Sequence, residues 1–364
     1  MKIPVQLLRD GLDVVLKGIA GYKNAPNYLK CVHLTIDKTN LILRTSDTLI
    51  QVVVTKPFIS EEALTALLPA DIFANLISKV TKTEITLEDK GGFVYQVKAD
   101  GQYKIMGMDP AFLKDISTMN TSPLVDLGTL DIADVKTGFR KVTSTVSEDL
   151  TRPNLCGIFL DGPTGKFVTA DGVRLSVFKL KQPALDSIFF NSSVAKVIAG
   201  LAFSTATIHK ADTYMKIELD SEIVVYSRLV DGLFPNYNMI IDKINKDAKI
   251  FVELDVETMG EALKRCAIFR EQETMVFLYI QPTSVGIKVG KIGEGKEVVP
   301  AVSNVIEPMT IALNIDFLIT CFDTLTKGPS RWKIIVPTAP IMIEQDDTIY
   351  SCILAPYTVE GIKA

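Results

Sequence analysis

The residues that most often carry out chemistry are scarce in this sequence. Histidine occurs only at His33 and His209, so a His-based catalytic triad or a His-rich metal site has almost nothing to build from. His33 lies in an apolar run, where a strand side chain is expected rather than a ligand. Neither a G-x-S-x-G nor an H-E-x-x-H motif is present. We therefore expect a protein that is not an enzyme, with no catalytic site, no metal site and no cofactor.

The cysteines do not suggest a disulfide framework or a zinc site. They are odd in number, widely spaced and form no C-x-x-C pair. Their positions are Cys31, Cys156, Cys266, Cys321 and Cys352. This usage is typical of buried free thiols in a reducing compartment, so we expect a cytoplasmic protein.

Two short motifs imitate functional ones. Residues 290–296 (GKIGEGK) match the spacing of a phosphate-binding loop, but Glu297 stands where Ser or Thr would bind magnesium. Glu294 would also repel a phosphate, so we interpret the segment as a hairpin loop. The neighbouring acids Asp346 and Asp347 have no acid–base partner near them in the sequence, and we expect a solvated loop there.

The composition is that of a folded protein of two or three domains. The chain has 364 residues, of which 47% are hydrophobic and 23% charged, and its formal net charge is -4. The mean hydropathy is +0.25. There is no run of 18 apolar residues, and Arg9, Asp10 and Asp13 interrupt the apolar run at the N-terminus. We therefore expect neither a signal peptide nor a membrane partner, and no globally basic nucleic-acid binder.

Amphipathic helix patterns recur at nearly constant steps along the chain. One series opens at Pro4, Asp131 and Asp255. Another opens at Pro69, Asn191 and Asn314, with steps of 122 and 123 residues. Within each copy the two helices lie about 60 residues apart, so we expect each copy to consist of two halves. Two series with one period indicate a threefold internal repeat.

Strand patterns fill the intervals between the expected helices. Residues 50–54 and 223–226 are rich in β-branched residues, and Asp-Gly pairs at 161–162, 171–172 and 231–232 mark turns. The sequence therefore predicts an α+β protein of three similar domains, each with two helices and about eight short, mostly antiparallel strands. The expected boundaries are 1–122, 123–248 and 249–364.

Net charge is distributed unevenly over the six expected helices. The four helix segments of the first two domains each carry +1, whereas those of the third domain carry 0 and -1. Positive helices in an acidic protein could form a face for a phosphate backbone. Ordinary scatter of surface charge explains the same counts equally well.

Five segments taken in order resemble the bacterial sliding clamp, the DNA polymerase III beta subunit family. They are 151–160 (TRPNLCGIFL), 169–177 (TADGVRLSV), 229–237 (LVDGLFPNY), 313–318 (LNIDFL) and 352–356 (CILAP). The length and the threefold period also agree, while the first domain matches mainly by pattern. The sequence departs from the family at Val173, usually His, and at Ala355, usually Met before Pro. The chain then continues through Tyr357 to Ala364.

The resemblance implies a head-to-tail homodimer that closes as a ring around double-stranded DNA without reading its sequence. Implied partners are a DNA polymerase catalytic subunit, a clamp loader and peptides that carry a clamp-binding motif, usually of the Gln-Leu-x-Leu-Phe type. The dimer interface would join the first domain of one copy to the third domain of the other. Its expected residues are Tyr103, Ile105, Met106, Ile268 and Phe269.

Two further sets of residues follow from the resemblance and the charge pattern. A peptide-binding pocket between the second and third domains would be built from Leu155, Ala170, Gly172, Val173, Arg174, Leu175, Pro235, Met239, Ile240, Pro340, Ile353, Leu354, Ala355, Pro356 and Tyr357. DNA-facing basic residues would be Lys17, Lys23, Lys79, Lys82, Arg140, Lys141, Arg152, Lys196 and Arg270. Two other classes remain open at this point: a hydrolase or transferase with an unrecognised site, and a scaffold that uses the repeat only for assembly.

Overall fold

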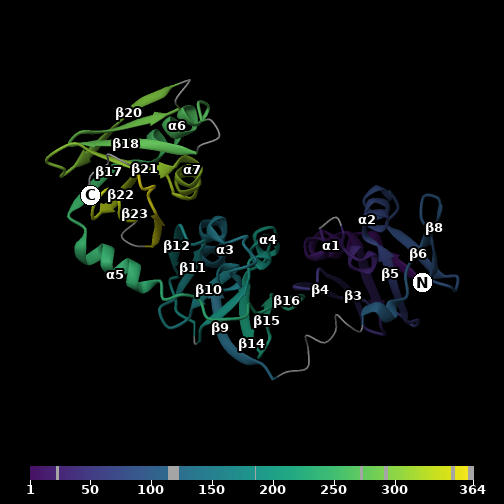
Figure 1. Ribbon diagram of the computed structural model, residues 1–364. Helices are drawn as coiled ribbons and strands as arrows, with labels where there is room; N and C mark the ends of the chain where they lie inside the picture. Colours follow the sequence, from purple (N-terminus) through teal and green to yellow (C-terminus); the bar gives the residue numbers. More distant parts are fainter. Residues whose placement is uncertain are drawn as a thin grey trace. The chain divides into compact units, whose positions relative to one another are not determined.

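The computed structural model describes residues 1–21, 24–113, 123–184, 186–270, 274–290, 294–345 and 349–359 (Figure 1). Lys23, Asp346, Asp347 and the centre of the 290–296 loop lie outside these residues. Among the described elements one half-repeat recurs six times: a strand, a helix and three further strands. The prediction of an α+β protein with two helices and about eight strands in each third is confirmed.

The first third of the chain runs from β1 to β8. Its elements are β1 (Lys2–Pro4), α1 (Val5–Val15), β2 (Cys31–Ile36), β3 (Asn40–Ser46), β4 (Ile50–Pro57), β5 (Leu64–Pro69), α2 (Ala70–Lys79), β6 (Glu84–Asp89), β7 (Val94–Lys98) and β8 (Gln102–Met106).

The middle third repeats this order. Its elements are β9 (Val125–Asp131), α3 (Ile132–Val142), β10 (Gly157–Asp161), β11 (Lys166–Ala170), β12 (Arg174–Lys179), β13 (Ile188–Asn191), α4 (Ser193–Ala199), β14 (Thr205–Lys210), β15 (Tyr214–Leu219) and β16 (Ile223–Arg228).

An additional helix, α5 (Asn238–Asp247), precedes the last third. The last third then contains β17 (Ile250–Asp255), α6 (Val256–Ala267), β18 (Met275–Gln281), β19 (Ser284–Val289), β20 (Gly295–Ser303), β21 (Met309–Asn314), α7 (Ile315–Thr324), β22 (Pro329–Ile334), β23 (Ile341–Gln345) and β24 (Tyr350–Leu354).

The helices form where the apolar period predicted them. In α1, Val5, Leu8, Leu12 and Val15 recur at helical spacing and are buried. The Asp255 carboxylate accepts a hydrogen bond from the Thr258 amide at the start of α6. The Asn314 side chain caps α7 in the same way. Such caps satisfy amide groups that have no partner inside the helix, which fixes where each helix begins.

The chain divides into two compact units, each containing half of the middle third. One unit contains Met1–Ala133 and Ala184–Leu229, and the other contains Asp134–Pro183 and Val230–Ala364. In the first unit one antiparallel sheet has the order β5-β2-β3-β4-β16-β15-β14-β9, and a smaller sheet has the order β1-β6-β7-β8. The three-domain boundaries stay a prediction, because sheets run on from one third of the chain to the next.

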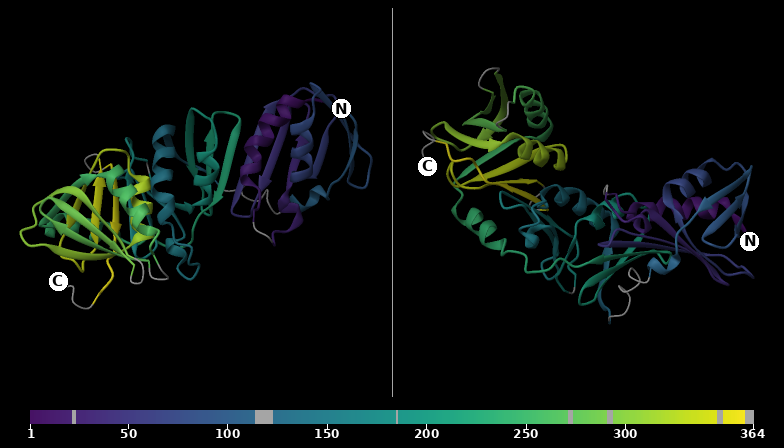
Figure 2. Two further views of the ribbon diagram at one scale, coloured as in Figure 1. Left: turned by 90° about the horizontal axis from the view of Figure 1, so that it is seen from above. Right: turned by 45° about the vertical axis from the view of Figure 1, so that its right-hand side comes forward.

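In the second unit the sheet order is β10-β11-β12-β24-β23-β22-β17-β20-β19-β18-β21. Helices α6 and α7 pack against each other, and strands and helices form adjoining layers (Figure 2). On the other face of the sheet, the α5 residues Ile241 and Ile244 join a core with Leu175, Met342 and Ile353. This core positions α5 beside β12 and β24.

All five cysteines are free, as expected, and four of them are buried. Burial of Cys31 raises the pKa of its thiol to about 11. The Cys31 thiol therefore stays protonated and unreactive near neutral pH. The prediction of buried free thiols is confirmed for these four, whereas Cys156 is half-buried.

The strand position expected for His33 is also confirmed, and it has a consequence for stability. Burial, with Arg44 opposite it on β3, lowers the pKa of His33 from 6.5 to about 4. Between these two values the unfolded chain binds a proton that the folded chain excludes. We therefore expect stability to fall as pH drops from 6.5 to 4, by at most about 1.4 kcal/mol per pH unit from this group. Urea unfolding from pH 7 to 4 should show a weaker pH dependence for His33→Gln; equal pH dependence in both proteins would contradict the assignment.

Candidate functional site

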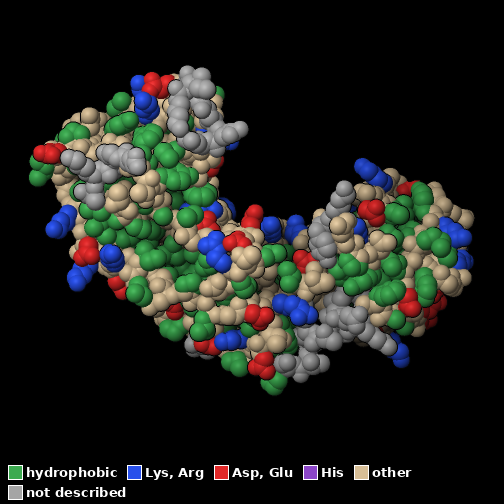
Figure 3. Space-filling view, in the orientation of Figure 1, with side chains coloured by type: hydrophobic (Ala, Val, Ile, Leu, Met, Phe, Trp, Pro, Cys, Tyr) green, Lys and Arg blue, Asp and Glu red, His purple; other side chains and the backbone are tan. Residues whose placement is uncertain are grey.

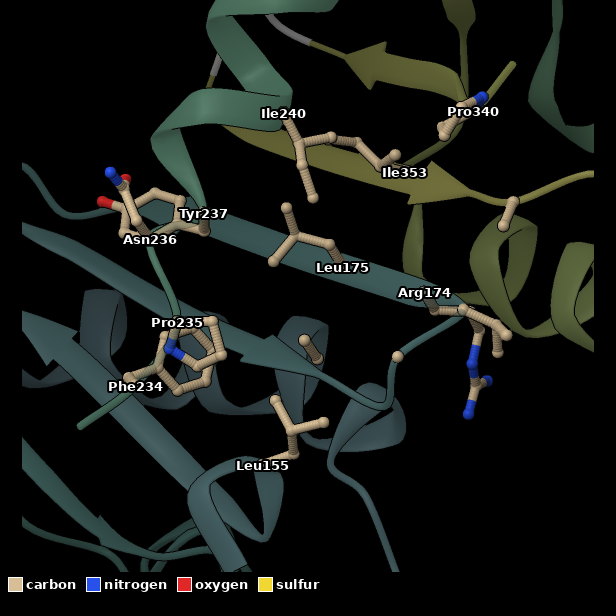
Figure 4. A pocket seen from close by; sticks show the side chains of 14 residues that line it. Leu155, Arg174, Leu175, Phe234, Pro235, Asn236, Tyr237, Ile240, Pro340 and Ile353 are labelled. Carbon is tan, nitrogen blue, oxygen red and sulfur yellow. The ribbon is translucent and has the colours of Figure 1, made fainter. Parts of the chain in front are cut away.

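An apolar cavity of about 240 Å³ lies in the second compact unit, beside β11, β12, β24 and the start of α5 (Figure 4). The Leu175 and Ile353 side chains are opposite each other on β12 and β24 and line it. The structure brings these residues of the predicted pocket together: Leu155, Ala170, Gly172, Val173, Arg174, Leu175, Pro235, Ile240, Pro340, Ile353 and Ala355. That the cavity binds a peptide stays a prediction.

Four residues of the predicted set are not among those that line the cavity: Met239, Leu354, Pro356 and Tyr357. Leu354 follows Ile353 in β24, and successive strand residues point to opposite faces of a sheet. Met239 lies on α5 and is exposed. The Tyr357 hydroxyl lies near Thr274 and Asn314 instead.

Sequence reasoning missed three lining residues, Phe234, Asn236 and Tyr237. The Phe234 ring stacks on Phe159 with centroids 5.2 Å apart, and the Tyr237 hydroxyl donates to the Asp161 carboxylate at 2.6 Å. Burial and this carboxylate raise the pKa of Tyr237. The available signal was the helical spacing of the apolar residues Tyr237, Ile241 and Ile244. This spacing predicts a helix after residue 237 whose apolar side packs on the sheet.

A tight turn shapes the cavity rim. The Asp171 carboxylate accepts from the amides of Val173 and Arg174, at 2.9 and 2.7 Å. Gly172, between Asp171 and Val173, has a φ of +95°. A Cβ on this residue would lie 2.5 Å from a guanidinium nitrogen of Arg152. The positive φ favours glycine at this position, and any other side chain would also displace the Arg152 guanidinium. Arg152, expected to face DNA, therefore lies against the turn of the cavity.

Arg174 is held in place by neighbouring groups. Its Nε donates to the Asp171 carboxylate at 2.7 Å, and both side chains are largely buried. Its guanidinium also lies 4.0 Å from the centre of the Phe317 ring. Because the charge is compensated and Nε is occupied, the cavity offers mainly apolar surface to an incoming group.

Most of the predicted DNA-facing residues are exposed, namely Lys17, Lys79, Lys82, Arg140, Arg152, Lys196 and Arg270, whereas Lys141 is half-buried. Lys23 lies outside the described residues. On the described part of the face in Figure 3, basic and acidic side chains are interspersed. That the predicted residues share one face stays a prediction.

Two of the predicted lysines lie at the carboxyl ends of helices. The ammonium of Lys141 donates to the Thr324 carbonyl oxygen at the end of α7, at 2.7 Å. Lys17 follows α1 and lies beside Gly200, which ends α4. Positive charge is favourable at this end of a helix, so both lysines have a structural use.

The basic residues around α6 and α7 are paired with acids. Arg270 forms an ion pair with Asp316, and Lys264 lies 3.0 Å from the Asp323 carboxylate. Arg265 binds the Glu297 carboxylate through two nitrogens, each at 2.7 Å. These basic charges are therefore compensated locally in the folded chain.

The expected interface residues lie on two separate features. On β8, Tyr103 and Met106 are exposed, whereas Ile105 is buried and could offer only its backbone. After α6, Ile268 and Phe269 are exposed, and the Phe269 ring packs over Gly295. Whether these features meet in a dimer stays a prediction.

In the described residues, no cluster of three or more His, Cys, Asp or Glu side chains could hold a metal ion. No helix of the described part is long and apolar enough to cross a membrane.

The whole chain superimposes on bacterial clamps. The DNA polymerase sliding clamp from Pseudomonas aeruginosa has a TM-score of 0.87 and 16% sequence identity, over 99% of both chains. This chain has the sliding-clamp fold. The clamps from Bacillus subtilis and C. crescentus each give a TM-score of 0.86, with 17% and 18% identity and 98% coverage of both chains. The C. crescentus clamp has polyethylene glycol bound at the region proposed to tether its beta motif.

Sequence comparison finds similarity to curated proteins that are also named beta sliding clamps. The beta sliding clamp of Rickettsia felis is 24% identical over 316 residues, which cover 82% of this chain and 80% of that protein. No family model matches the sequence. The predicted resemblance to sliding clamps is therefore confirmed for the fold.

Proposed function

We propose that this protein is a DNA sliding clamp, a ring-shaped processivity factor that encircles duplex DNA and tethers a replicative DNA polymerase. The observation that carries the proposal is the match of nearly the whole chain to bacterial clamps at TM-scores of 0.83–0.87. The function is not catalytic, and it places the protein with DNA in the cytoplasm. A clamp loader and other replication and repair proteins are the expected partners.

Two junctions inside the chain suggest how the ring closes. Strand β4 pairs antiparallel with β16, and β12 pairs antiparallel with β24. Each of these four is the last strand of its half-repeat. The remaining last strands are β8 and β20. By the same rule, β8 of one copy would pair with β20 of another.

The free edges of β8 and β20 support this closure. Strand β8 ends the sheet β1-β6-β7-β8. In the described ladders, the Gly295–Pro300 part of β20 pairs only with β19, because β17 takes up the later part of the strand. Exposed strand edges invite pairing with another chain. A head-to-tail contact of this kind repeats until it closes, and two copies close it as a ring.

The deciding experiment uses nicked circular DNA. After loading by a clamp loader with ATP, the protein should stay on the circle and leave once the DNA is linearised, because its link to DNA is topological. Gel filtration of loaded DNA before and after a restriction cut measures this. Ile268→Asp, a variant expected to weaken the dimer, is the control and should be retained less on the circle. Equal retention on linear and circular DNA would contradict the proposal.

DNA contact in such a ring is directed at phosphates, so it depends on salt. We expect Arg140→Gln to reduce the slope of log affinity against log salt by about 0.9, the value of one phosphate contact. The matched change Arg270→Gln should alter the slope much less, because Asp316 already compensates that charge. Fluorescence anisotropy of a labelled duplex across a KCl series measures both. Equal slopes for the two variants, or a marked sequence preference, would count against this assignment.

A further inference from the structure

We propose that Tyr357 is a positioning residue that holds residues 355–357, here called the strap, as a fixed wall of the cavity. The inference rests on the proposed function, since it assumes that the cavity receives a partner peptide. Tyr357 does not itself line the cavity, whereas Ala355 does. Any effect of Tyr357 on peptide binding would therefore act through the strap.

The backbone of the strap is anchored at both ends. The Ala355 amide donates to the Val173 carbonyl oxygen on the cavity rim at 2.9 Å. The Tyr357 amide donates to the Ala312 carbonyl oxygen on β21 at 2.8 Å. Pro356 between them has no amide donor and a restricted φ, which limits the paths the strap can take. The strap thus spans from the end of β24 to β21.

The Tyr357 hydroxyl adds a third anchor. It lies 3.2 Å from the Thr274 hydroxyl and accepts from the Asn314 side-chain amide at 3.2 Å. The same amide donates to Thr274 at 2.8 Å. The side-chain oxygen Oδ1 of Asn314 meanwhile accepts from the amides of Asp316 and Phe317. Asn314 is therefore immobilised by α7, and it offers Tyr357 a fixed partner.

The rim turn beside the strap uses the same support. Phe317, in the first turn of α7, lies against the guanidinium of Arg174, and Arg174 is bonded to Asp171 in the rim turn. The start of α7 therefore fixes both the rim turn and, through Asn314 and Tyr357, the strap. With few buried side chains of its own, the strap depends on these hydrogen bonds for its position.

This arrangement predicts a kinetic signature. A strap that is only fractionally in place lowers the fraction of protein ready to bind, and the association rate falls by that fraction. Once a peptide is bound it holds the strap itself, so dissociation changes little. Loss of a side chain that touches the peptide would have the opposite pattern, with faster dissociation.

The test is surface plasmon resonance with an immobilised Gln-Leu-x-Leu-Phe peptide, Ala at x. We expect Tyr357→Phe to slow association about fivefold, as loss of shared hydrogen bonds of ordinary strength would, with dissociation within twofold of wild type. Tyr279→Phe on β18 is the matched control, because Tyr279 is 38% exposed and Tyr357 37% exposed. It should bind like wild type. Hydrogen exchange of residues 352–357 should quicken only in Tyr357→Phe.

A second variant, Thr274→Val, makes the test independent of any one side chain. Because both changes disrupt one network, Tyr357→Phe combined with Thr274→Val should slow association much less than the product of the single effects. Wild-type kinetics in Tyr357→Phe, with binding abolished by Leu175→Asp, would overturn this inference alone. Absence of peptide binding by the wild-type protein would overturn both the inference and the peptide site of the proposed function.

Discussion

The substitution Leu175→Asp is expected to reduce binding of a Gln-Leu-x-Leu-Phe peptide by about 100-fold or more. Leu175 lines the cavity and is buried against Ile353. A carboxylate there would remove an apolar contact surface and would have to be desolvated, unpaired, when a peptide enters. Fluorescence anisotropy with a labelled peptide measures the loss.

A second variant separates a binding effect from a folding effect. Ile240 lines the cavity from α5 and is 43% exposed, so Ile240→Asp should fold normally and weaken the peptide about tenfold. Leu49, 42% exposed in the turn before β4, is the matched control, and Leu49→Asp should bind like wild type. If Ile240→Asp and Leu49→Asp bind equally well, the peptide site lies elsewhere.

Much of this cavity could be predicted from the resemblance to sliding clamps, which implies most of its residues by position. The Asp171-Gly172 pair predicts a turn, and Gly172 does have a positive φ. The family motif predicts both Ile353 and Leu354 in the pocket, but Leu354 does not line the cavity. The two residues are neighbours in a strand, so their side chains point to opposite faces of the sheet. The helix α5 was not predicted, and Phe234 and Tyr237 were missed with it.

Charge partners were the least predictable part. Counting residues gave the third-domain helix pair a net charge of -1, but the pairing of Arg270 with Asp316 joins residues 46 positions apart. Arg152 and Gly172 likewise meet only in the folded chain. The period of the repeat, in contrast, depends on local helix and strand patterns, which is why all six half-repeats were legible from spacing alone.

The substitution Ile268→Asp is expected to raise the dissociation constant of the dimer roughly 10- to 100-fold. Ile268 is 77% exposed in the single chain, and Phe269 beside it is exposed as well. Next to them begins β20, the strand edge that we propose pairs with β8 of another copy. A carboxylate at position 268 would lose its hydrating water at the junction without gaining a basic side chain as a partner. Sedimentation velocity from nanomolar to micromolar protein measures the dimer.

Phe269→Asp should have a larger effect, part of it within the protomer, because the Phe269 ring packs over Gly295 at the start of β20. Because Ile268 is exposed in the single chain, Ile268→Asp should leave the fold unchanged, and its effect on the dimer reports on the interface alone. Ile59, 90% exposed between β4 and β5, supplies the matched control. Ile59→Asp should dimerise like wild type. If Ile268→Asp and Phe269→Asp also remain dimers at low micromolar concentration, the junction between β8 and β20 is wrong, and a different pair of surfaces must close the ring.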